Sequence, residues 1–235
     1  MRGVRVGDEL KVLVFNGWAA GPEAWRLCTF PHDWLFDYVE QLDGLPDRVM
    51  EDSDEVLLVG FSMGGSMALK TLLKYPEKVK GLVLVSATPR MMEERKATVQ
   101  GGGEEVVWKG MSERRLKALR LGTLMTIKDD PSPMYRVENL DRGLEYLQKT
   151  DIRDDLINYS RGLSPGKRLP VALFQSERDG IVRPNNVEFL KRIFPQAAVT
   201  LVPGNEHVLP VMVPALIDAA IYGIINALLD QEGVF

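Results

Sequence analysis

The sequence predicts an α/β protein, in which a mostly parallel sheet carries helices on both faces and a helical segment is inserted. Three observations support this prediction. Apolar runs of strand length alternate with helical patterns toward both ends of the chain, which is typical of parallel sheets. A Gly-x-Ser-x-Gly motif at positions 60–64 separates one such run from a helical pattern. The stretch from about 89 to 168 has helical patterns but no strand pattern.

The elements of the core follow from the spacing of apolar residues. Short apolar runs predict strands near 12–16, 35–39, 55–60, 81–87, 171–176 and 198–203. Helical spacing predicts helices near 64–74, 184–193 and 213–229. The last of these lies in a stretch, 208–229, that carries a single charge, Asp218, and approaches the length of a membrane span. Pro210 and Pro214 interrupt its start, so we expect a terminal helix packed on the sheet.

The inserted segment is predicted to be helical, with patterns at 112–127 and 140–148. We therefore expect residues 1–88 and 169–235 to form the core and residues 89–168 to form a helical lid over the site.

Ser62 is the candidate nucleophile. The motif Gly60–Gly64 alone is weak evidence, because glycine and serine are common in ordinary turns. Here it follows the apolar run Val56–Val59 and leads into a helical pattern. Strand, motif and helix together favour a nucleophile elbow, a turn so tight that the serine hydroxyl stands clear at the strand end.

A serine nucleophile needs a base and a carboxylate that orients the base. The chain has two histidines. In this arrangement the base follows the serine in the chain, so His207 is favoured over His32. The favoured acid is Asp179, in the loop after the predicted strand 171–176; Glu177 is its competitor, and Asp154 and Asp155 are distant ones. The alternative for His207 is a solvated loop histidine, and the alternative for Asp179 is a residue of an ordinary Asp-Gly turn.

Acyl transfer also needs donors for the developing oxyanion, typically two backbone N–H groups. Met63 follows the nucleophile directly and supplies one candidate. Trp18, in the turn after the first predicted strand, supplies the other, and its indole would cover one side of the pocket. An ordinary packed aromatic is the alternative for Trp18.

These motifs resemble the α/β-hydrolases. Within them, the sequence is most similar to the pimeloyl-acyl-carrier-protein methyl ester esterases of biotin synthesis, a likeness strengthened by the stretch Leu140–Leu156. The resemblance implies an α/β-hydrolase fold, triad roles for Ser62, Asp179 and His207, and oxyanion roles for Trp18 and Met63. The sequence departs from the family in two ways. Asn16 precedes Gly17 where the family usually has histidine, and only 44 positions separate Trp18 from Ser62, which abbreviates the helix expected between them.

Composition agrees with a cytoplasmic enzyme of 235 residues, 45% apolar and 26% charged. The single cysteine, Cys28, excludes an internal disulfide and is expected to pack in the interior. The start of the chain has no apolar signal-peptide core. Two histidines and one cysteine make a zinc site improbable, and a net charge of −4 opposes nucleic-acid binding. We expect no cofactor, no metal and no membrane partner.

The predicted lid is basic. Residues 89–168 hold 16 Lys and Arg against 13 Asp and Glu. The surplus lies at positions 109–120, where Glu113 alone opposes five basic residues: Lys109, Arg114, Arg115, Lys117 and Arg120. Acyl carrier proteins are strongly acidic, so Arg114, Arg115, Lys117 and Arg120 are candidate carrier contacts. A solvated helix face is the alternative.

The sequence as a whole predicts a serine carboxylic-ester hydrolase, with the methyl ester of pimeloyl-acyl carrier protein as the favoured substrate. A general short-chain carboxylesterase or thioesterase is the first alternative, and a carbon–carbon hydrolase shares the same triad. A non-catalytic ligand-binding protein of the same fold is the alternative from another class.

Overall fold

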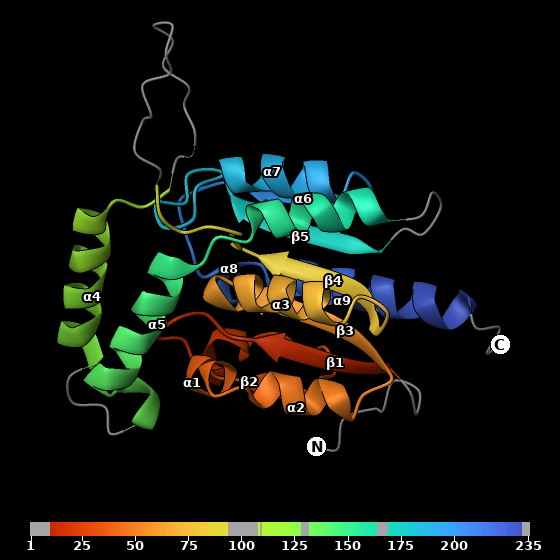
Figure 1. Ribbon diagram of the computed structural model, residues 1–235, viewed down its shortest axis with the longest axis horizontal. Coiled ribbons are helices and arrows are strands. Elements are labelled where there is room, and N and C mark those ends of the chain that lie inside the picture. Colours follow the sequence, from red (N-terminus) through yellow and green to blue (C-terminus); the bar gives the residue numbers. More distant parts are fainter. Residues whose placement is uncertain (1–9, 94–107, 109, 128–131, 164–168, 232–235) are drawn as a thin grey trace, which may run out of the picture.

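A computed structural model of the chain describes residues 10–93, 108, 110–127, 132–163 and 169–231 (Figure 1). Within these residues, six strands form one sheet in which every neighbouring pair is parallel. Across the sheet the strands run in the order β2 (Trp34–Phe36), β1 (Leu10–Phe15), β3 (Glu55–Phe61), β4 (Val79–Val85), β5 (Val171–Ser176) and β6 (Ala198–Val202). The order changes direction at β1, and ligands of open parallel sheets bind at such a point, beyond the carboxyl ends of the strands.

Helices cover both faces of this sheet (Figure 1). One face packs on α2 (Leu45–Glu51), α3 (Met63–Lys74), α6 (Arg153–Gly162) and α7 (Asn185–Ile193). The other face packs on the 3-10 helix η1 (Pro22–Trp25), α8 (Leu209–Met212) and α9 (Pro214–Gln231). Alternate strand residues supply the two cores, as in β1, where Leu13 faces the first and Val12 the second.

The predicted strand at 35–39 is too long. Strand β2 ends at Phe36 because Asp37 begins helix α1 (Tyr38–Leu42) with a capping box. The Asp37 carboxylate accepts from the N–H groups of Val39 and Glu40 at 2.8 and 2.9 Å, and the Glu40 carboxylate accepts from Asp37 N–H at 3.0 Å. The other predicted core strands and helices are present within two residues of their expected ends.

The apolar stretch near the end of the chain forms α8 and α9 rather than one long helix. Ile217, Ile221 and Ile225 of α9 are buried against the sheet. Asp218 is also buried, and its carboxylate accepts hydrogen bonds from Thr29 N–H and Oγ1 at 2.9 and 2.7 Å. Its charge therefore anchors the loop at position 29. Across the described ranges, no helix has both the length and the hydropathy that a membrane crossing needs.

Helices α4 (Glu113–Ile127) and α5 (Val137–Lys149), with the short 3-10 helix η2 (Pro133–Tyr135), lie beyond the carboxyl ends of the strands (Figure 1, green). They correspond to the two helical patterns expected in the insertion. Helix α6 also lies within residues 89–168, but its Leu156 is buried in the cluster that includes residues of α3. The division into core and lid stays a prediction, since residues 94–107, 109, 128–131 and 164–168 lie outside the described part.

Candidate active site

Ser62 occupies a strained turn between β3 and α3. Its backbone has φ 54° and ψ −118°, a region that residues with a side chain rarely enter. The motif glycines make the turn possible, because a Cβ on Gly64 would lie 2.1 Å from Phe15 O and one on Gly60 would lie 2.7 Å from Gly64 O. The backbone of β1 and the first turn of α3 therefore approach too closely for any side chain. This is the geometry expected of a nucleophile elbow.

A continuous chain of hydrogen bonds links Ser62, His207 and Asp179. His207 Nε2 lies 2.9 Å from Ser62 Oγ, and His207 Nδ1 lies 2.8 Å from Asp179 Oδ2. The three residues follow β3, β6 and β5, so parallel strands bring together positions up to 145 residues apart. A neutral imidazole with its proton on Nδ1 can donate to the carboxylate and accept from the serine hydroxyl at the same time.

Asp179 is held in place by further donors. Its side chain is fully buried, and Oδ1 accepts from the N–H groups of Ile181 and Val182 at 2.7 and 3.0 Å. Oδ2 accepts from Gln175 Nε2 at 3.1 Å as well as from His207. Glu177, by contrast, is exposed. The structure thus brings Asp179, and not its competitor, to the histidine.

The remaining candidate acids and the second histidine lie elsewhere. Asp154 and Asp155 are exposed in the first turn of α6. His32 is exposed too, and its ring contacts Phe30 edge-on with 6.0 Å between ring centroids. None of the three has a hydrogen bond to the Ser62–His207–Asp179 chain within the part that the structure describes.

Two serines that the sequence analysis missed hold the histidine loop. Ser86 Oγ donates to His207 O at 2.9 Å, and Ser176 Oγ donates to Glu206 O. Ser86 follows β4 and Ser176 ends β5, and both are fully buried. A serine near the end of a predicted strand was the available indication in the sequence, but the partner of each hydroxyl is 30 or more positions away.

The two candidate oxyanion donors both lie close to the serine. Met63 is the first residue of α3 and follows Ser62 directly. Trp18 lies in the turn after β1, and a Cβ on the preceding Gly17 would lie 3.0 Å from Ser62 Cβ, so this turn abuts the nucleophile. Within the described residues, neither Trp18 N–H nor Met63 N–H has a hydrogen-bond acceptor. Both N–H groups are therefore available to an oxygen bound beside Ser62.

Asn16 precedes the Trp18 turn and is held by buried hydrogen bonds. It is fully buried, its Nδ2 donates to Phe36 O at 3.1 Å, and its Oδ1 accepts from Trp25 Nε1 at 2.7 Å. Gln41 Nε2 donates to Asn16 O at 3.0 Å. The asparagine that departs from the usual family pattern thus has its own network, and the short α1 supplies one member of that network.

A pocket of about 490 Å³ opens above Ser62 and His207. Its lining is mostly apolar. The Trp18 turn, α4, α5 and the loops around the triad contribute to it: Trp18, Ala19, Ser62, Met91, Ala118, Leu119, Gly122, Thr123, Thr126, Leu147, Ile181 and His207. Helices α4 and α5 therefore form its outer wall, and the cavity suits an apolar chain that presents a carbonyl to Ser62.

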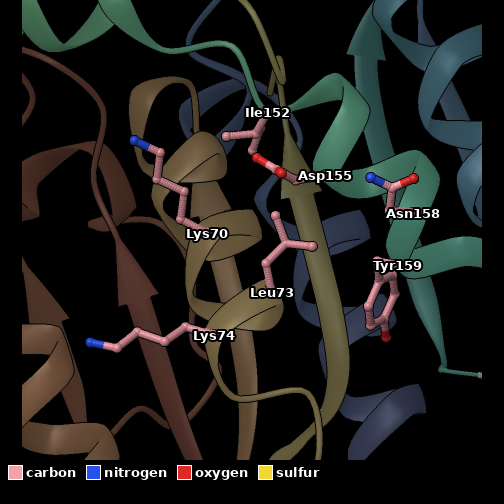
Figure 2. A pocket seen from close by; sticks show the side chains of 7 residues that line it. All are labelled: Lys70, Leu73, Lys74, Ile152, Asp155, Asn158 and Tyr159. Atoms are coloured by element: carbon pink, nitrogen blue, oxygen red, sulfur yellow. The ribbon is translucent and has the colours of Figure 1, made fainter. Parts of the chain in front are cut away.

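A second cavity of about 530 Å³ lies between α3 and α6 (Figure 2). Lys70 and Lys74 point to the same side of it, away from Asn158 and Tyr159. Lys74 pairs with Asp47 at 2.8 Å, and Lys70 lies 4.3 Å from the centroid of the Tyr146 ring. Burial lowers the pKa of Lys70, with Asp155 opposing the shift. These contacts tie α3 to its neighbours. Asp155, one of the distant candidate acids, lines this cavity, and Ser62, Asp179 and His207 do not.

Cys28 behaves as a packed residue. It is a free, partly buried thiol whose Sγ lies 3.6 Å from Pro210 O. Burial, together with the nearby Asp218 carboxylate, raises its pKa to about 12. A thiol with so high a pKa is a poor nucleophile at neutral pH.

The basic residues of α4 differ in their surroundings. Arg114, Arg115 and Lys117 are exposed, whereas Arg120 makes a bidentate ion pair with Asp141 of α5 at 2.5 and 2.8 Å. Arg115 also lies close to the loop that carries Asp179, because a Cβ added to Gly180 would be 3.3 Å from Arg115 Nη2. Lys109 falls outside the described residues.

Comparison with known proteins agrees with this architecture. Residues 51–110 match the family model for the alpha/beta hydrolase fold. Among solved structures, an N-acyl homoserine lactone degrading enzyme, Est816, aligns over 92% of this chain and 93% of its own, with a TM-score of 0.63 at 15% identity. A deep-sea metagenome α/β-hydrolase from the Medee basin covers 96% and 92%, with a TM-score of 0.60 at 15% identity. The chain has the α/β-hydrolase fold, as its sequence predicted.

Curated relatives confirm the more specific resemblance. The pimeloyl-[acyl-carrier protein] methyl ester esterase of Hamiltonella defensa is 24% identical over 85% of this chain and 86% of its own length. The enzymes of the same name from Nitrosospira multiformis and Salmonella agona are 24% and 26% identical, over 71% and 66% of this chain and 68% and 63% of theirs. In sequence, this chain is therefore similar to curated methyl ester esterases.

Proposed function

We propose that the protein is a serine carboxylic-ester hydrolase in which Ser62, His207 and Asp179 form the catalytic triad. The observation that carries the proposal is the hydrogen-bonded chain from Ser62 Oγ through His207 to Asp179, with distances of 2.9 and 2.8 Å, at the floor of an apolar pocket. The strained elbow presents the hydroxyl, and the nearby N–H groups of Trp18 and Met63 have no acceptor among the described residues.

The chemistry follows from this geometry. Ser62 Oγ attacks the ester carbonyl carbon while His207 Nε2 takes the hydroxyl proton, and Asp179 stabilises the imidazolium that forms. The carbonyl oxygen becomes an oxyanion that the N–H groups of Trp18 and Met63 stabilise. His207 then gives its proton to the departing alkoxide. A water attacks the acyl-enzyme by the same steps, which releases the acid and restores Ser62.

The favoured substrate is the methyl ester of pimeloyl-acyl carrier protein. The names of the curated relatives support this substrate, and so does the outer side of α4. Arg114, Lys117, Leu121 and Met125 recur there at helical spacing, and Leu121 and Met125 are 60% and 70% exposed. A basic stripe that continues into exposed apolar residues is complementary to an acidic partner that presents some apolar surface.

Ester turnover tests the proposed chemistry. The wild-type protein should hydrolyse a simple ester steadily, and Ser62→Ala should retain the fold by circular dichroism while losing several powers of ten in kcat. Ser160→Ala, on α6, is the matched control and should keep full activity. A folded wild-type protein without turnover on any ester tested would favour the ligand-binding alternative.

Charge reversal on α4 tests the carrier. Arg114→Glu combined with Lys117→Glu should lower kcat/KM for a carrier-bound ester and spare a small free ester, and the loss should shrink with added salt. We leave Arg115 unchanged, since it lies close to Gly180, which follows Asp179 in the chain. The control reverses Arg48 and Arg192, exposed residues of α2 and α7, which changes the net charge equally.

The outcomes separate the substrates. Equal loss with both esters would mean that α4 only shapes the pocket, and no loss with either would favour a general carboxylesterase or thioesterase. Rescue of a biotin-requiring bacterium that lacks its own esterase would support the pimeloyl substrate directly, and failure to rescue with an active enzyme would contradict it.

A further inference from the structure

The indole of Trp18 connects the oxyanion turn to lid helix α5. Its Nε1–H donates to Leu140 O at 2.9 Å, across 122 positions of the chain. Leu140 lies in α5 and is fully buried. The turn on the other side of Trp18 abuts Ser62, as the close approach of Gly17 shows. Trp18 is therefore packed between the nucleophile and the lid.

Gly143, in the interior of α5, is the position that lets the indole lie there. A Cβ on Gly143 would be 2.4 Å from Trp18 Cδ1, 3.1 Å from Trp18 Nε1 and 3.2 Å from Tyr38 Cε2. Glycine in a helix interior destabilises the helix by about 1 kcal/mol relative to alanine. The edge of the indole occupies the space that a side chain would fill, which is a packing reason for the glycine.

Helix α5 is itself held against the core. Tyr38 OH donates to Met134 O just before α5, and Arg142 Nη2 pairs with Asp43 at 2.6 Å. Helices α1 and α5 lie side by side (Figure 1). On the turn itself, Ala19 has φ +54° and Ala20 N–H donates to Gly17 O at 3.2 Å. The backbone around Trp18 is thus a tight turn. Its orientation relative to Ser62 depends on the contacts that the Trp18 side chain makes with α5.

We infer that Gly143 and the Leu140 carbonyl of α5 are positioning residues for the oxyanion turn. They hold the Trp18 indole, and through it the Trp18 N–H, in the position that receives the ester oxygen. The lid helix thereby sets transition-state stabilisation as well as covering the pocket. This inference rests on the proposed esterase function.

The structure gives the size of the perturbation. To regain an ordinary contact of 3.4 Å with an added Cβ, the indole must move by about 1 Å. A displacement of that size costs up to about a hundredfold in rate, and loss of a whole oxyanion donor costs about 10²- to 10³-fold in kcat. Gly143→Ala should therefore lower kcat by about tenfold to a hundredfold and leave KM nearly unchanged.

Two matched controls separate this effect from a general effect of alanine in a helix. Gly162 in α6 and Gly223 in α9 are also helical, and a Cβ added at either meets no described residue within 4 Å. Gly162→Ala and Gly223→Ala should keep the wild-type kcat and KM. The pH profile of kcat/KM should keep its midpoint in Gly143→Ala, because the triad is untouched and only the level of the profile falls.

Trp18→Phe is the second variant, and it adds no atoms to the lid. It removes the Nε1 donor but keeps an aromatic ring, so kcat should fall several-fold with the fold intact. A double-mutant cycle uses a third variant, Trp18→Ala, which removes the whole indole. Gly143→Ala should have little further effect on kcat in the Trp18→Ala protein, since both changes act on one group.

The experiment distinguishes this inference from the proposed function. If Ser62→Ala abolishes turnover but Gly143→Ala equals Gly223→Ala, the esterase assignment stands and the positioning role of α5 is overturned. Additive effects of the Gly143 and Trp18 changes would overturn it as well. If Ser62→Ala retains turnover, the proposed function itself fails.

Discussion

Replacement of Asn16 by alanine tests whether the buried network under the oxyanion turn stabilises the fold. Asn16 Oδ1 is the acceptor for Trp25 Nε1 at 2.7 Å, and Trp25 is 5% exposed. Phe36 O would keep other donors, because Asn16 N–H and Gln41 Nε2 both lie 3.2 Å away. The change therefore leaves one buried donor, the Trp25 indole N–H, without a partner.

An unsatisfied buried donor costs about 1–3 kcal/mol. Asn16→Ala should lower the free energy of unfolding by that amount in urea titrations, with an unchanged m-value. Trp25→Phe alone leaves Asn16 Oδ1 unpaired and should also destabilise. The double variant has neither orphan, so its loss should be smaller than the sum of the two single losses by about 1 kcal/mol or more. Agreement with simple additivity would refute the reasoning, because the two side chains would then act independently.

Two further predictions concern carboxylates. Asp179→Asn should lower kcat by on the order of 10⁴-fold, because the histidine loses its charged partner, whereas the exposed Glu177→Gln should change kcat little; the reverse ranking in parallel ester assays would move the role to Glu177. Burial alone would raise the pKa of the Asp151 carboxyl, but hydrogen bonds from Arg153 and Arg90 lower it from 3.8 to about 2. A lowered folded-state pKa stabilises the protein above pH 3.8, and this contribution is lost as the pH falls toward 2. Asp151→Asn should therefore flatten the dependence of Tm on pH in that window, and an unchanged dependence would show that the ion pairs add nothing.

Much of the fold and of the candidate site follows from local patterns. Apolar runs located the strands, and Ser62, Asp179 and His207 could be selected because each follows a predicted strand in the order that parallel-strand hydrolases use. The end of β2 was misplaced because two further apolar residues, Tyr38 and Val39, follow Asp37. The capping signature of Asp37 and Glu40, which ends the strand, was present in the sequence.

The residues that support the site could not be predicted in the same way. Ser86 and Asn16 act through partners 121 and 20 positions away, so their roles depend on how the strands assemble. The same holds for Gly143, which in the sequence is only a weak helix former. The contact that explains it, with Trp18, exists only once α5 has docked beside the oxyanion turn.

The most direct test of the account is the site of covalent labelling by a fluorophosphonate, which reacts with an activated serine. The intact protein should react at Ser62 alone, as mapped by mass spectrometry of its peptides, and Ser62→Ala should not react. His207→Ala should slow the labelling strongly, since the base that activates the hydroxyl is lost. Labelling of the intact protein at a different serine, or equal labelling with and without His207, would contradict the assignment of Ser62 as the nucleophile.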